Sequence, residues 1–374
     1  MKIAYLHSGK FPSKSPSMTF VLFNSLGLSA TFEEVFLFLR NNSPYPTDNI
    51  LIEEYGIVKP NNLNIIRIKI SPLIRSSFIY NLMLFVKVRN TLKSRNIQAV
   101  VTRYIKFLPW LYRLKKYSKV KVFFESHDFY SKSLIDMSNK SKNSSLGKIE
   151  KKYIPKIDGV LCLQKTQIEL YKKIFPNYNK YFLARTGINN INRVEFNDRK
   201  YITYIGSFDK HKGINDLLEV YSKANTNYKL LLIGGKTTDE INEVLRLTNK
   251  YNISDKVEVT GWIDKKAVNS YLAKTLIGVL PLEPTFFNKY LTSPLKLFDY
   301  FSFGCPILAS DLPTVRELMQ ENEMGLFYNP TSKDDMLNKL NILLHENELL
   351  KNMSDNIYLK AEEYFWNKRG EKIK

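Results

Sequence analysis

Residues 293–311 read SPLKLFDYFSFGCPILASD, and this stretch predicts a helix, a tight turn and a buried strand in direct succession. Ser293 is a typical helix N-cap and proline is favoured in the first helical turn, so a helix should begin at Pro294. Gly304 is the expected stop signal of that helix. The apolar residues 307–309 then form a short buried strand, as in a parallel α/β sheet.

The start of this helix is a candidate phosphate site. The backbone of Ser293, Pro294 and Leu295 and the side chain of Lys296 suit a diphosphate, because a helix N-terminus and a lysine both attract anions. Asp299 lies about one turn further on, where its carboxylate could accept hydrogen bonds from ribose hydroxyls. The alternative is an ordinary helix and strand with surface charges, and the stretch alone does not decide between the two.

The composition favours a cytoplasmic protein of two domains. The chain has 374 residues, enough for two separate cores, and its hydrophobic content of 44% is ordinary. Cys162 and Cys305 lie in apolar runs, so we expect free thiols, and no zinc-ligand spacing occurs. The N-terminus lacks the apolar core of a signal peptide, and no apolar run reaches the ~20 residues that cross a bilayer.

The net charge of +20 predicts an anionic partner, which could be a phosphorylated substrate, an anionic lipid surface or nucleic acid. Residues 103–119, RYIKFLPWLYRLKKYSK, interleave basic and aromatic residues as interfacial membrane helices do. The alternative is a solvated helix whose aromatic side chains face the core. Nucleic acid is not expected, because the sequence has no zinc finger, aromatic RNA-binding signature or basic tail.

The rest of the chain predicts two doubly wound parallel sheets, because short apolar runs alternate with helical patterns such as Phe20 to Ala30 and Ser77 to Lys93. The polar stretch Thr186 to Lys200 is the expected linker. We therefore assign residues 1–195 and 196–351 to two Rossmann-like domains that face a central cleft, and 352–374 to a terminal helix that packs back toward the first domain. The predicted strands are Lys2 to Leu6, Glu34 to Leu39, Asn64 to Ile70, Ala99 to Thr102, Val120 to Glu125, Val160 to Leu163, Tyr201 to Ile205, Tyr228 to Ile233, Val257 to Val259, Ile277 to Leu280, Pro306 to Ala309 and Gly325 to Tyr328.

Three loops of the second domain carry candidate ligand-binding residues. Gly206, Ser207 and Lys212 follow the strand YITYI, where glycine permits close approach of a ligand and lysine supplies a charge for phosphate. A plain βα turn with a solvated lysine is the alternative. Gly234 ends the strand KLLLIG, and Trp262 and Ile263 follow another strand, where they could hold a nucleobase. For the Trp262 side chain we favour a partly buried core position.

Two loops of the first half carry candidates for the reaction centre and the acceptor. His127 and Asp128 come just after an apolar strand, so the imidazole could hydrogen-bond a sugar hydroxyl while Asp128 orients it. A capping pair on a loop is the alternative. Ser8, Gly9 and Lys10 are expected in a flexible loop after the first strand, suited to an acceptor or a phosphate.

Taken in order, these motifs resemble the retaining glycosyltransferases of family 4, which have the GT-B fold. The resemblance covers nearly the whole chain. It rests on MKIAYLHSGKFPS, the SHD loop, DGVLCLQKTQIELY, ARTGINN, YIGSFDKHKG, the VTGW segment, SPLKLFDYFSFGCPILASDLPTVREL and the terminal FWNKR. It implies a nucleotide-sugar donor bound mainly by the second domain, an acceptor bound mainly by the first, and no metal.

The resemblance also implies roles for individual residues. Lys212 looks like the lysine that contacts the donor diphosphate, Asp299 like the acidic residue that binds ribose, and His127 like the histidine beside the donor sugar. The sequence departs from the family at two positions. Ser207 stands where many members have a phosphate-binding arginine, and Leu291 stands where the first glutamate of a paired-acid motif is expected. The diphosphate should then rest on Lys212 and Lys296, and the donor sugar is not predicted.

The expected function is that of a metal-independent, hexosyltransferase-type enzyme (EC 2.4) that moves a sugar from a nucleotide sugar to an acceptor hydroxyl with retention. We expect no cofactor, a cytoplasmic location at the inner face of the membrane, and a lipid-linked saccharide acceptor in surface polysaccharide or glycolipid biosynthesis. The alternative is a non-catalytic GT-B subunit that binds a sugar or scaffolds a synthase, which the two departures from the family favour.

Overall fold

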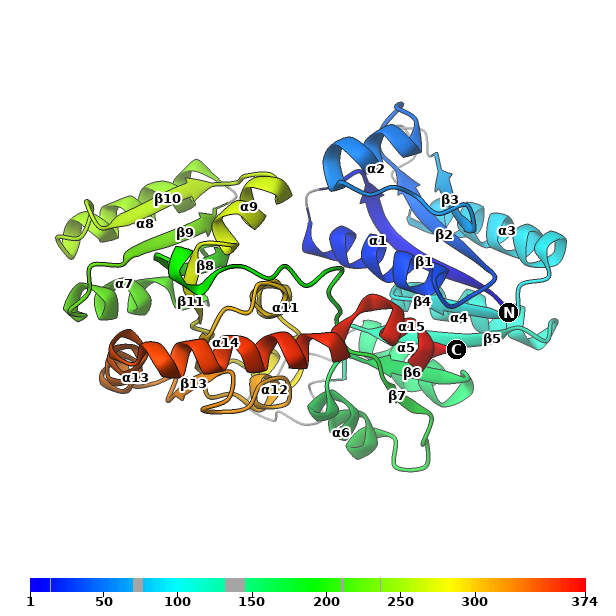
Figure 1. Cartoon of the computed structure of the whole chain (residues 1–374). Coiled ribbons are helices and arrows are strands. Elements are labelled where there is room, and N and C mark those ends of the chain that lie inside the picture. The colour runs from blue at the N-terminus through cyan, green and yellow to red at the C-terminus, as the bar shows by residue number, and fades with distance from the viewer. Residues whose placement is uncertain (14, 70–76, 132–144, 210–211, 236) are drawn as a thin grey trace. The chain divides into compact units, whose positions relative to one another are not determined.

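The computed structural model describes residues 1–13, 15–69, 77–131, 145–209, 212–235 and 237–374 of the chain, which divide into two compact units. The first unit consists of Met1–Gly187 and Trp366–Lys374, and the second of Ile188–Phe365. Both are α/β domains with one parallel sheet each (Figure 1). This confirms the expected fold class of two Rossmann-like domains. Three positions named by the predicted motifs and strand ends, 70, 210 and 211, lie outside the described residues.

The first unit is built on a seven-stranded parallel sheet in the order β3-β2-β1-β4-β5-β6-β7. Its strands β4 and β6 are buried along their whole length, which is why they read as continuous apolar runs in the sequence. The strands are β1 (Lys2–Phe11), β2 (Glu34–Asn41), β3 (Leu63–Ile68), β4 (Ala99–Thr102), β5 (Lys121–Ser126), β6 (Gly159–Cys162) and β7 (Tyr181–Leu183). The helices are α1 (Pro16–Ser29), α2 (Thr47–Tyr55), α3 (Ser77–Arg95), α4 (Leu108–Lys116), α5 (Ser145–Tyr153), α6 (Lys165–Ile174) and α15 (Trp366–Ile373).

The last helix of the chain, α15, completes this first unit. It packs along α1, and a side chain on Gly27 would collide with the backbone of Trp366, with a Cβ only 2.3 Å from the Trp366 carbonyl oxygen. Trp366 also meets the Phe20 ring edge-to-face at 5.1 Å. Glycine at position 27 is therefore what lets the C-terminal helix lie against α1.

The second unit repeats the same topology with six parallel strands in the order β10-β9-β8-β11-β12-β13. The strands are β8 (Tyr201–Gly206), β9 (Lys229–Gly234), β10 (Val257–Gly261), β11 (Thr275–Leu280), β12 (Ile307–Ser310) and β13 (Gly325–Tyr328). The helices are α7 (Ile214–Lys223), α8 (Thr238–Lys250), α9 (Lys265–Leu272), α10 (Phe286–Tyr290), α11 (Leu295–Ser302), α12 (Pro313–Arg316), α13 (Lys333–His345) and α14 (Asn347–Ala361).

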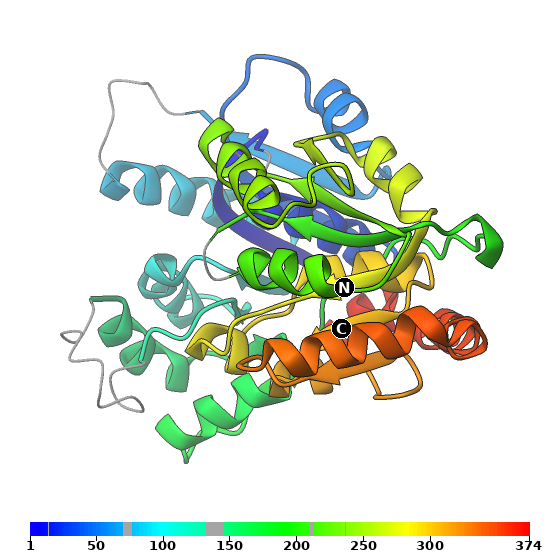
Figure 2. The same ribbon diagram turned by 90° about the vertical axis from the view of Figure 1, so that its left-hand side faces the viewer.

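Two hydrophobic cores cover the faces of this second sheet. One contains apolar side chains of α7, α8 and α13, and Figure 2 shows α7 and α13 side by side. The other contains α11, α12 and the end of α14, with Phe298 and Tyr364 in edge-to-face contact at 5.4 Å. A parallel sheet covered on both faces is the arrangement that the alternating apolar pattern predicts.

The segment predicted as a linker is part of the second unit from Ile188 onward. The Ile188 amide donates to the Tyr364 carbonyl, and the Arg199 guanidinium is buried, donating to the carbonyl oxygens of Thr275 and Phe303. The chain therefore divides after Gly187 and not after residue 195. Likewise only Trp366–Lys374 joins the first unit, because the preceding helix α14 packs on α11.

Two further observations concern the cysteines and the length of the helices. Cys162 and Cys305 are both buried free thiols, as expected. Within the described ranges, no helix is long and apolar enough to cross a membrane.

Candidate functional site

The two sheets share a topology that marks one position in each of them for ligand binding. The strand order reverses direction between β1 and β4 in the first unit and between β8 and β11 in the second. In doubly wound sheets, ligands bind outside the carboxyl ends of the strands at this point, because the flanking loops diverge there. Gly206 is the last residue of β8, and His127 directly follows β5, the neighbour of β4.

In the second unit, Lys296 lies against the end of β8. Its ammonium nitrogen is 3.7 Å from the centroid of the Tyr204 ring, and a Cβ on Gly206 would lie only 3.1 Å from it. The nitrogen is buried and, among the residues that the structure describes, has no hydrogen-bond partner. Burial, and after it the charge of Lys212, lowers the pKa of Lys296 well below its usual range. The Lys296 ammonium therefore has no paired anion among the described residues, and the charge of a second lysine, Lys212, acts on it.

The start of α11 differs from the sequence prediction. The helix begins at Leu295 with Pro294 as its N-cap residue, so Ser293 lies one position before the cap. Pro294 has an extended ψ of 117° and its ring supplies no capping oxygen. The expectation that Ser293 caps the helix is wrong, but Lys296 is in the first turn as predicted.

Asp299 lies on α11 one turn after Lys296 and is about one-third exposed. Its carboxylate accepts a hydrogen bond of 2.7 Å from Lys265, the first residue of α9. The ion pair is at the surface, so its net contribution to stability is small. A ribose that binds at Asp299 would share the carboxylate with Lys265, a neighbour that the sequence did not predict.

The neighbouring strand ends show which predicted residues are exposed to a ligand. Trp262 is 50% exposed, so the interpretation of its side chain as a core residue is wrong, and its indole remains available to a nucleobase. Ile263, next to it, is half-buried. Ser207 donates a hydrogen bond of 2.5 Å to Asp209. Gly234 is needed for the sheet itself, because a Cβ there would lie 1.9 Å from the Gly206 carbonyl oxygen.

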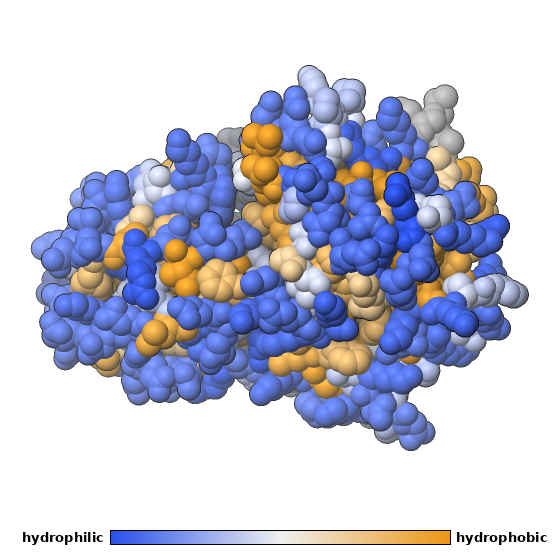
Figure 3. All heavy atoms as spheres, turned by 45° about the vertical axis from the view of Figure 1, so that its right-hand side comes forward, coloured by the Kyte–Doolittle hydropathy of each residue, from blue (hydrophilic) through white to orange (hydrophobic). Residues whose placement is uncertain are grey.

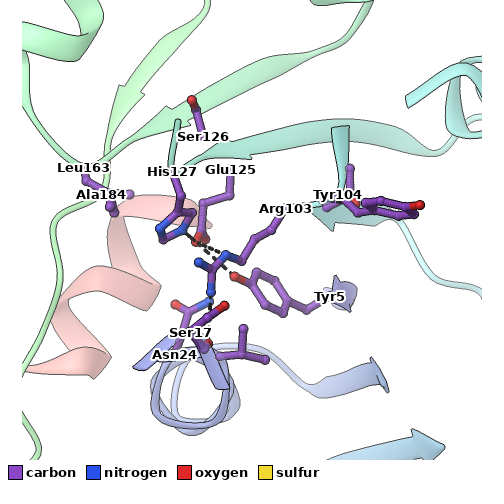
Figure 4. Close-up of polar contacts among 12 residues, drawn as sticks. Tyr5, Ser17, Asn24, Arg103, Tyr104, Glu125, Ser126, His127, Leu163 and Ala184 are labelled. Carbon is purple, nitrogen blue, oxygen red and sulfur yellow. Dashed lines mark hydrogen bonds and ion pairs between the residues drawn. The ribbon is translucent and has the colours of Figure 1, made fainter. Parts of the chain in front are cut away.

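In the first unit, a fully buried carboxylate organises the end of β5. The Tyr5 hydroxyl donates to Glu125 at 3.0 Å, and the His127 Nε2 contacts the same oxygen at 2.5 Å. The second oxygen accepts a hydrogen bond of 2.7 Å from Arg369 of α15. Figure 4 shows Tyr5, Arg103, Glu125 and His127 pointing toward one another from β1, the segment after β4, and β5.

Two guanidinium groups keep the buried Glu125 carboxylate ionised. Burial alone would raise the pKa of the Glu125 carboxyl, but the charge of Arg369, the His127 hydrogen bond and the charge of Arg103 together lower it below its usual range. Arg369 is itself buried, and it also donates to Asn24 of α1 at 2.7 Å. The carboxylate is therefore ionised at neutral pH and holds the C-terminal helix to the sheet.

The same cluster keeps the imidazoles uncharged. Burial and the charge of Arg103 lower the pKa of His127, despite the opposing hydrogen bond to Glu125, and the same two causes lower that of His7 to about 3. A neutral imidazole whose Nε2 carries the proton donated to Glu125 has its Nδ1 as the acceptor. The carboxylate that orients the ring is thus Glu125, whereas Asp128 accepts a hydrogen bond from the Phe129 amide.

The predicted flexible loop at Ser8, Gly9 and Lys10 is wrong, because β1 continues to Phe11. After an irregularity in register, Lys10 and Phe11 pair with Arg40 and Asn41 of β2. Gly9 makes room for the His7 ring, since a Cβ there would lie 2.3 Å from the His7 Nε2. Their role in acceptor binding stays a prediction.

The sequence reasoning missed three members of the buried cluster: Glu125, Arg103 and Arg369. A single acidic residue inside the apolar run VFFES is a signal for Glu125, since an unpaired buried carboxylate is rarely tolerated. Nothing local indicates its partner, which lies 244 positions away. Lys265 was missed for the same reason.

Comparison with known proteins shows which protein family the second unit is similar to. Residues 189–360 match the family model described as glycosyl transferases group 1. The matched range spans nearly all of the second unit, so the similarity to this family is located there. The group 1 part of the expected resemblance is thereby confirmed, whereas family 4 and retention stay predictions.

The chain spans about half the length of the curated relatives it matches. An uncharacterized glycosyltransferase from Haemophilus influenzae is 24% identical, with 55% of this chain and 57% of the relative covered. An N-acetylgalactosamine-N,N'-diacetylbacillosaminyl-diphospho-undecaprenol 4-alpha-N-acetylgalactosaminyltransferase from Campylobacter jejuni is 26% identical, with 48% and 47% covered.

Solved structures resemble the whole chain in fold. Sucrose-phosphate synthase from Thermosynechococcus elongatus gives a TM-score of 0.77 at 18% identity and covers 100% of this chain and 97% of its own. HepE from Anabaena, in complex with UDP, gives 0.75 at 11% identity and covers 100% and 98%. At these identities the likeness establishes the fold, which is that of GT-B glycosyltransferases.

Proposed function

We propose that the protein is a glycosyltransferase that moves a sugar from a nucleotide sugar to an acceptor hydroxyl, with retention at the anomeric carbon. The observation that carries the proposal is the buried ammonium of Lys296, which has no hydrogen-bond partner among the described residues and lies beside Gly206. Such a group is costly to bury unless an anion binds it. The group 1 family match of this unit and the HepE complex with UDP support a nucleoside diphosphate as that anion.

In this proposal the second unit stabilises the leaving group. As the bond between the anomeric carbon and the diphosphate breaks, negative charge grows on the phosphate oxygens. Lys296 and Lys212 would stabilise that charge in a site poor in water, where an electrostatic contact is stronger than in bulk solvent. Asp299 would accept hydrogen bonds from the ribose, and the exposed Trp262 would contact the base.

The first unit would contribute His127. With its Nε2 proton donated to Glu125, its neutral imidazole can accept one hydrogen bond from a sugar hydroxyl at Nδ1, and Glu125 fixes the orientation of the ring. The departing diphosphate would take the acceptor proton, which leads to attack on the face that the leaving group vacates and so to retention. This route needs no metal. Within the described ranges, no group of three or more His, Cys, Asp or Glu side chains could hold one, and metal independence stays a prediction.

The donor assignment is tested with calorimetric titration of nucleoside diphosphates into the wild-type protein and the Lys212→Ala and Asp299→Ala variants. We expect one base to bind most tightly and both variants to bind it more weakly. Sugar transfer is then measured with the nucleotide sugars of that base, and NMR of the product gives the anomeric configuration. Failure of every nucleoside diphosphate to bind the wild type would contradict the proposal.

A second candidate function is a non-catalytic subunit that binds a nucleotide sugar. It is favoured by Leu291, which is 1% exposed and occupies the position where a paired glutamate was expected. A buried leucine offers no hydrogen bond to a donor sugar. Tight nucleotide binding without transfer or donor hydrolysis, for every nucleotide sugar of that base, would support this candidate.

For the acceptor we propose a lipid-linked saccharide in surface polysaccharide or glycolipid assembly, used at the inner face of the membrane. The Campylobacter relative is named for a diphospho-undecaprenol substrate, which is of this class. The strongly basic composition of the chain is consistent with an anionic, membrane-bound substrate. Transfer to a synthetic polyprenyl-diphosphate sugar, compared with the same free sugar, tests this choice.

A further inference from the structure

Helix α3 of the first unit carries large apolar side chains on its exposed side. They occupy its first two and a half turns, and each is between 39 and 62% exposed. They are Phe78, Ile79, Leu82, Met83 and Val86. Figure 3 shows hydrophobic atoms at the surface on the side of the first unit where Figure 1 places α3. Clusters of this kind mark interaction surfaces, because isolated exposed apolar residues are ordinary but contiguous ones are not.

The exposed apolar side chains are not the ones that hold the helix to its domain. Tyr80, Leu84, Val88 and Leu92 follow one another at four-residue spacing and are buried against the unit. The exposed residues occupy the other side of the helix. Burial of α3 in its own core therefore leaves this second apolar face uncovered.

Helix α4 lies beside α3 and extends the surface. The Trp110 ring is 5.8 Å from Phe78 and 5.3 Å from Phe85, and the Arg113 guanidinium lies over the same ring at 5.9 Å. Tyr117, just after α4, is 90% exposed. The predicted aromatic surface of residues 103–119 is thus only partly correct, because Phe107 and Leu111 are buried in the core and the main apolar face is on α3.

The segment of sequence that contains α3 and α4 is strongly basic. Residues 55–124, which include α3 and α4, contain fifteen Lys and Arg residues and no Asp or Glu. On the exposed side of α3 itself, Lys87, Arg89 and Lys93 follow the apolar turns and are exposed. An apolar face followed along its helix by exposed basic residues complements an anionic lipid surface, since the acyl region takes the apolar side chains and the headgroups take the charges.

We propose that α3, supported by α4, docks the first unit onto an anionic phospholipid surface. The apolar turns at Phe78, Leu82 and Val86 would enter the interface, while Arg89 and Lys93 would contact headgroup phosphates. The proposal concerns binding of the chain to lipid and does not depend on which reaction it catalyses. It can therefore fail while the transfer reaction stands, and the reverse also holds.

The test is flotation of the full chain with vesicles of equal parts phosphatidylglycerol and phosphatidylcholine, compared with pure phosphatidylcholine. We expect the wild type to float with the anionic vesicles at low salt. Removal of two surface charges in Arg89→Gln/Lys93→Gln should weaken this binding about thirtyfold, at ~1 kcal/mol per basic residue. Leu82→Asn/Met83→Asn/Val86→Asn should weaken binding to the anionic vesicles at least as much.

The matched control replaces three exposed apolar residues elsewhere, in Leu245→Asn/Ile342→Asn/Leu359→Asn, which should float like the wild type. Circular dichroism checks that all variants stay folded. All the replaced side chains are exposed, so unfolding is not expected. If the wild type did not float with the anionic vesicles, the proposal would be overturned. A face that binds a soluble acidic protein would give this result. Equal flotation of the α3 variants and the control would overturn it as well.

Discussion

Replacement of Lys296 by methionine should have two opposite effects, because the buried ammonium is costly to the folded protein and useful to the bound anion. Methionine keeps the apolar stem and removes the charge. In the structure the ammonium gains only its contact with the Tyr204 ring at 3.7 Å, and no hydrogen bond from the described residues. A desolvated cation–π contact contributes about 2 kcal/mol, which is less than the several kcal/mol that burial of an ion costs.

We therefore expect Lys296→Met to stabilise the ligand-free protein by about 1 to 2 kcal/mol, or about 2 to 8 °C in Tm for a unit of this size. The pH dependence follows from the lowered pKa of Lys296. At a pH below that pKa, Lys296 is charged in both the folded and the unfolded chain, so the buried charge destabilises the wild type by its full amount. As the pH rises from that pKa toward 10.5, Lys296 loses its proton in the folded chain but keeps it in the unfolded chain. The stability difference between the variant and the wild type then shrinks.

Binding of a nucleoside diphosphate should change in the other direction. A charge-assisted hydrogen bond contributes about 1.5 to 3 kcal/mol, so the variant should bind the diphosphate about 10- to 100-fold more weakly. Calorimetric titration measures this Kd, and differential scanning calorimetry without ligand measures the stability. The matched control is Lys266→Met, an exposed lysine on α9, which should change neither quantity.

Two results would refute this reasoning. An unchanged Kd would mean that Lys296 does not face the diphosphate. A lower Tm without ligand would mean that the ammonium is stabilised by its surroundings, so that its burial is structural. Because the two measurements are independent, either part can fail without the other.

Three further predictions concern stability. Arg369→Gln should lower the free energy of unfolding, measured by urea denaturation, by about 3 to 5 kcal/mol, because it removes a charge partner of a buried carboxylate. The control Lys360→Gln breaks only a surface ion pair and should lower it by less than ~1 kcal/mol. Gly213→Ala should lower the free energy of unfolding more than Gly56→Ala in the same assay. Both have positive φ, but only at position 213 does the new Cβ collide with a backbone oxygen, at 2.0 Å. His127→Gln should flatten the loss of stability below pH 6.5, since in the wild type the unfolded chain takes up a proton there before the folded chain does.

The sheets were predictable from the sequence because parallel strands buried on both faces read as short apolar runs. KLLLIG is one example: every residue of β9 after Lys229 is buried. The edge strand β7 was missed, since its three residues are half-buried or exposed and carry no such run. The end of β1 was missed because the run His7 to Lys10 is polar or glycine and the strand pairs again only at Lys10 and Phe11, after an irregularity in register.

The candidate donor site was predictable in part, because its residues lie close together in sequence and follow strand ends. Lys212 and Lys296 were chosen as candidates from loop and helix patterns, whereas the contact of Lys296 with Tyr204 at the end of β8 required the fold. The cap at Ser293 was wrong by one position. In the first unit the orienting carboxylate of His127 was assigned to Asp128, the adjacent residue, when the fold supplies Glu125 from the strand itself.

The chain buries two charged groups beside its sheet switch points, and their partners distinguish their roles. Glu125 and Lys296 are both charged residues within apolar sequence, so local pattern treats them alike. The Glu125 carboxylate contacts a hydroxyl, an imidazole and a guanidinium. These groups compensate its desolvation without any ligand. Lys296 contacts an aromatic face and feels the charge of another lysine, so we expect its desolvation to be compensated by a bound anion. The first arrangement orients the His127 ring, and we expect the second to bind the diphosphate of the proposed donor.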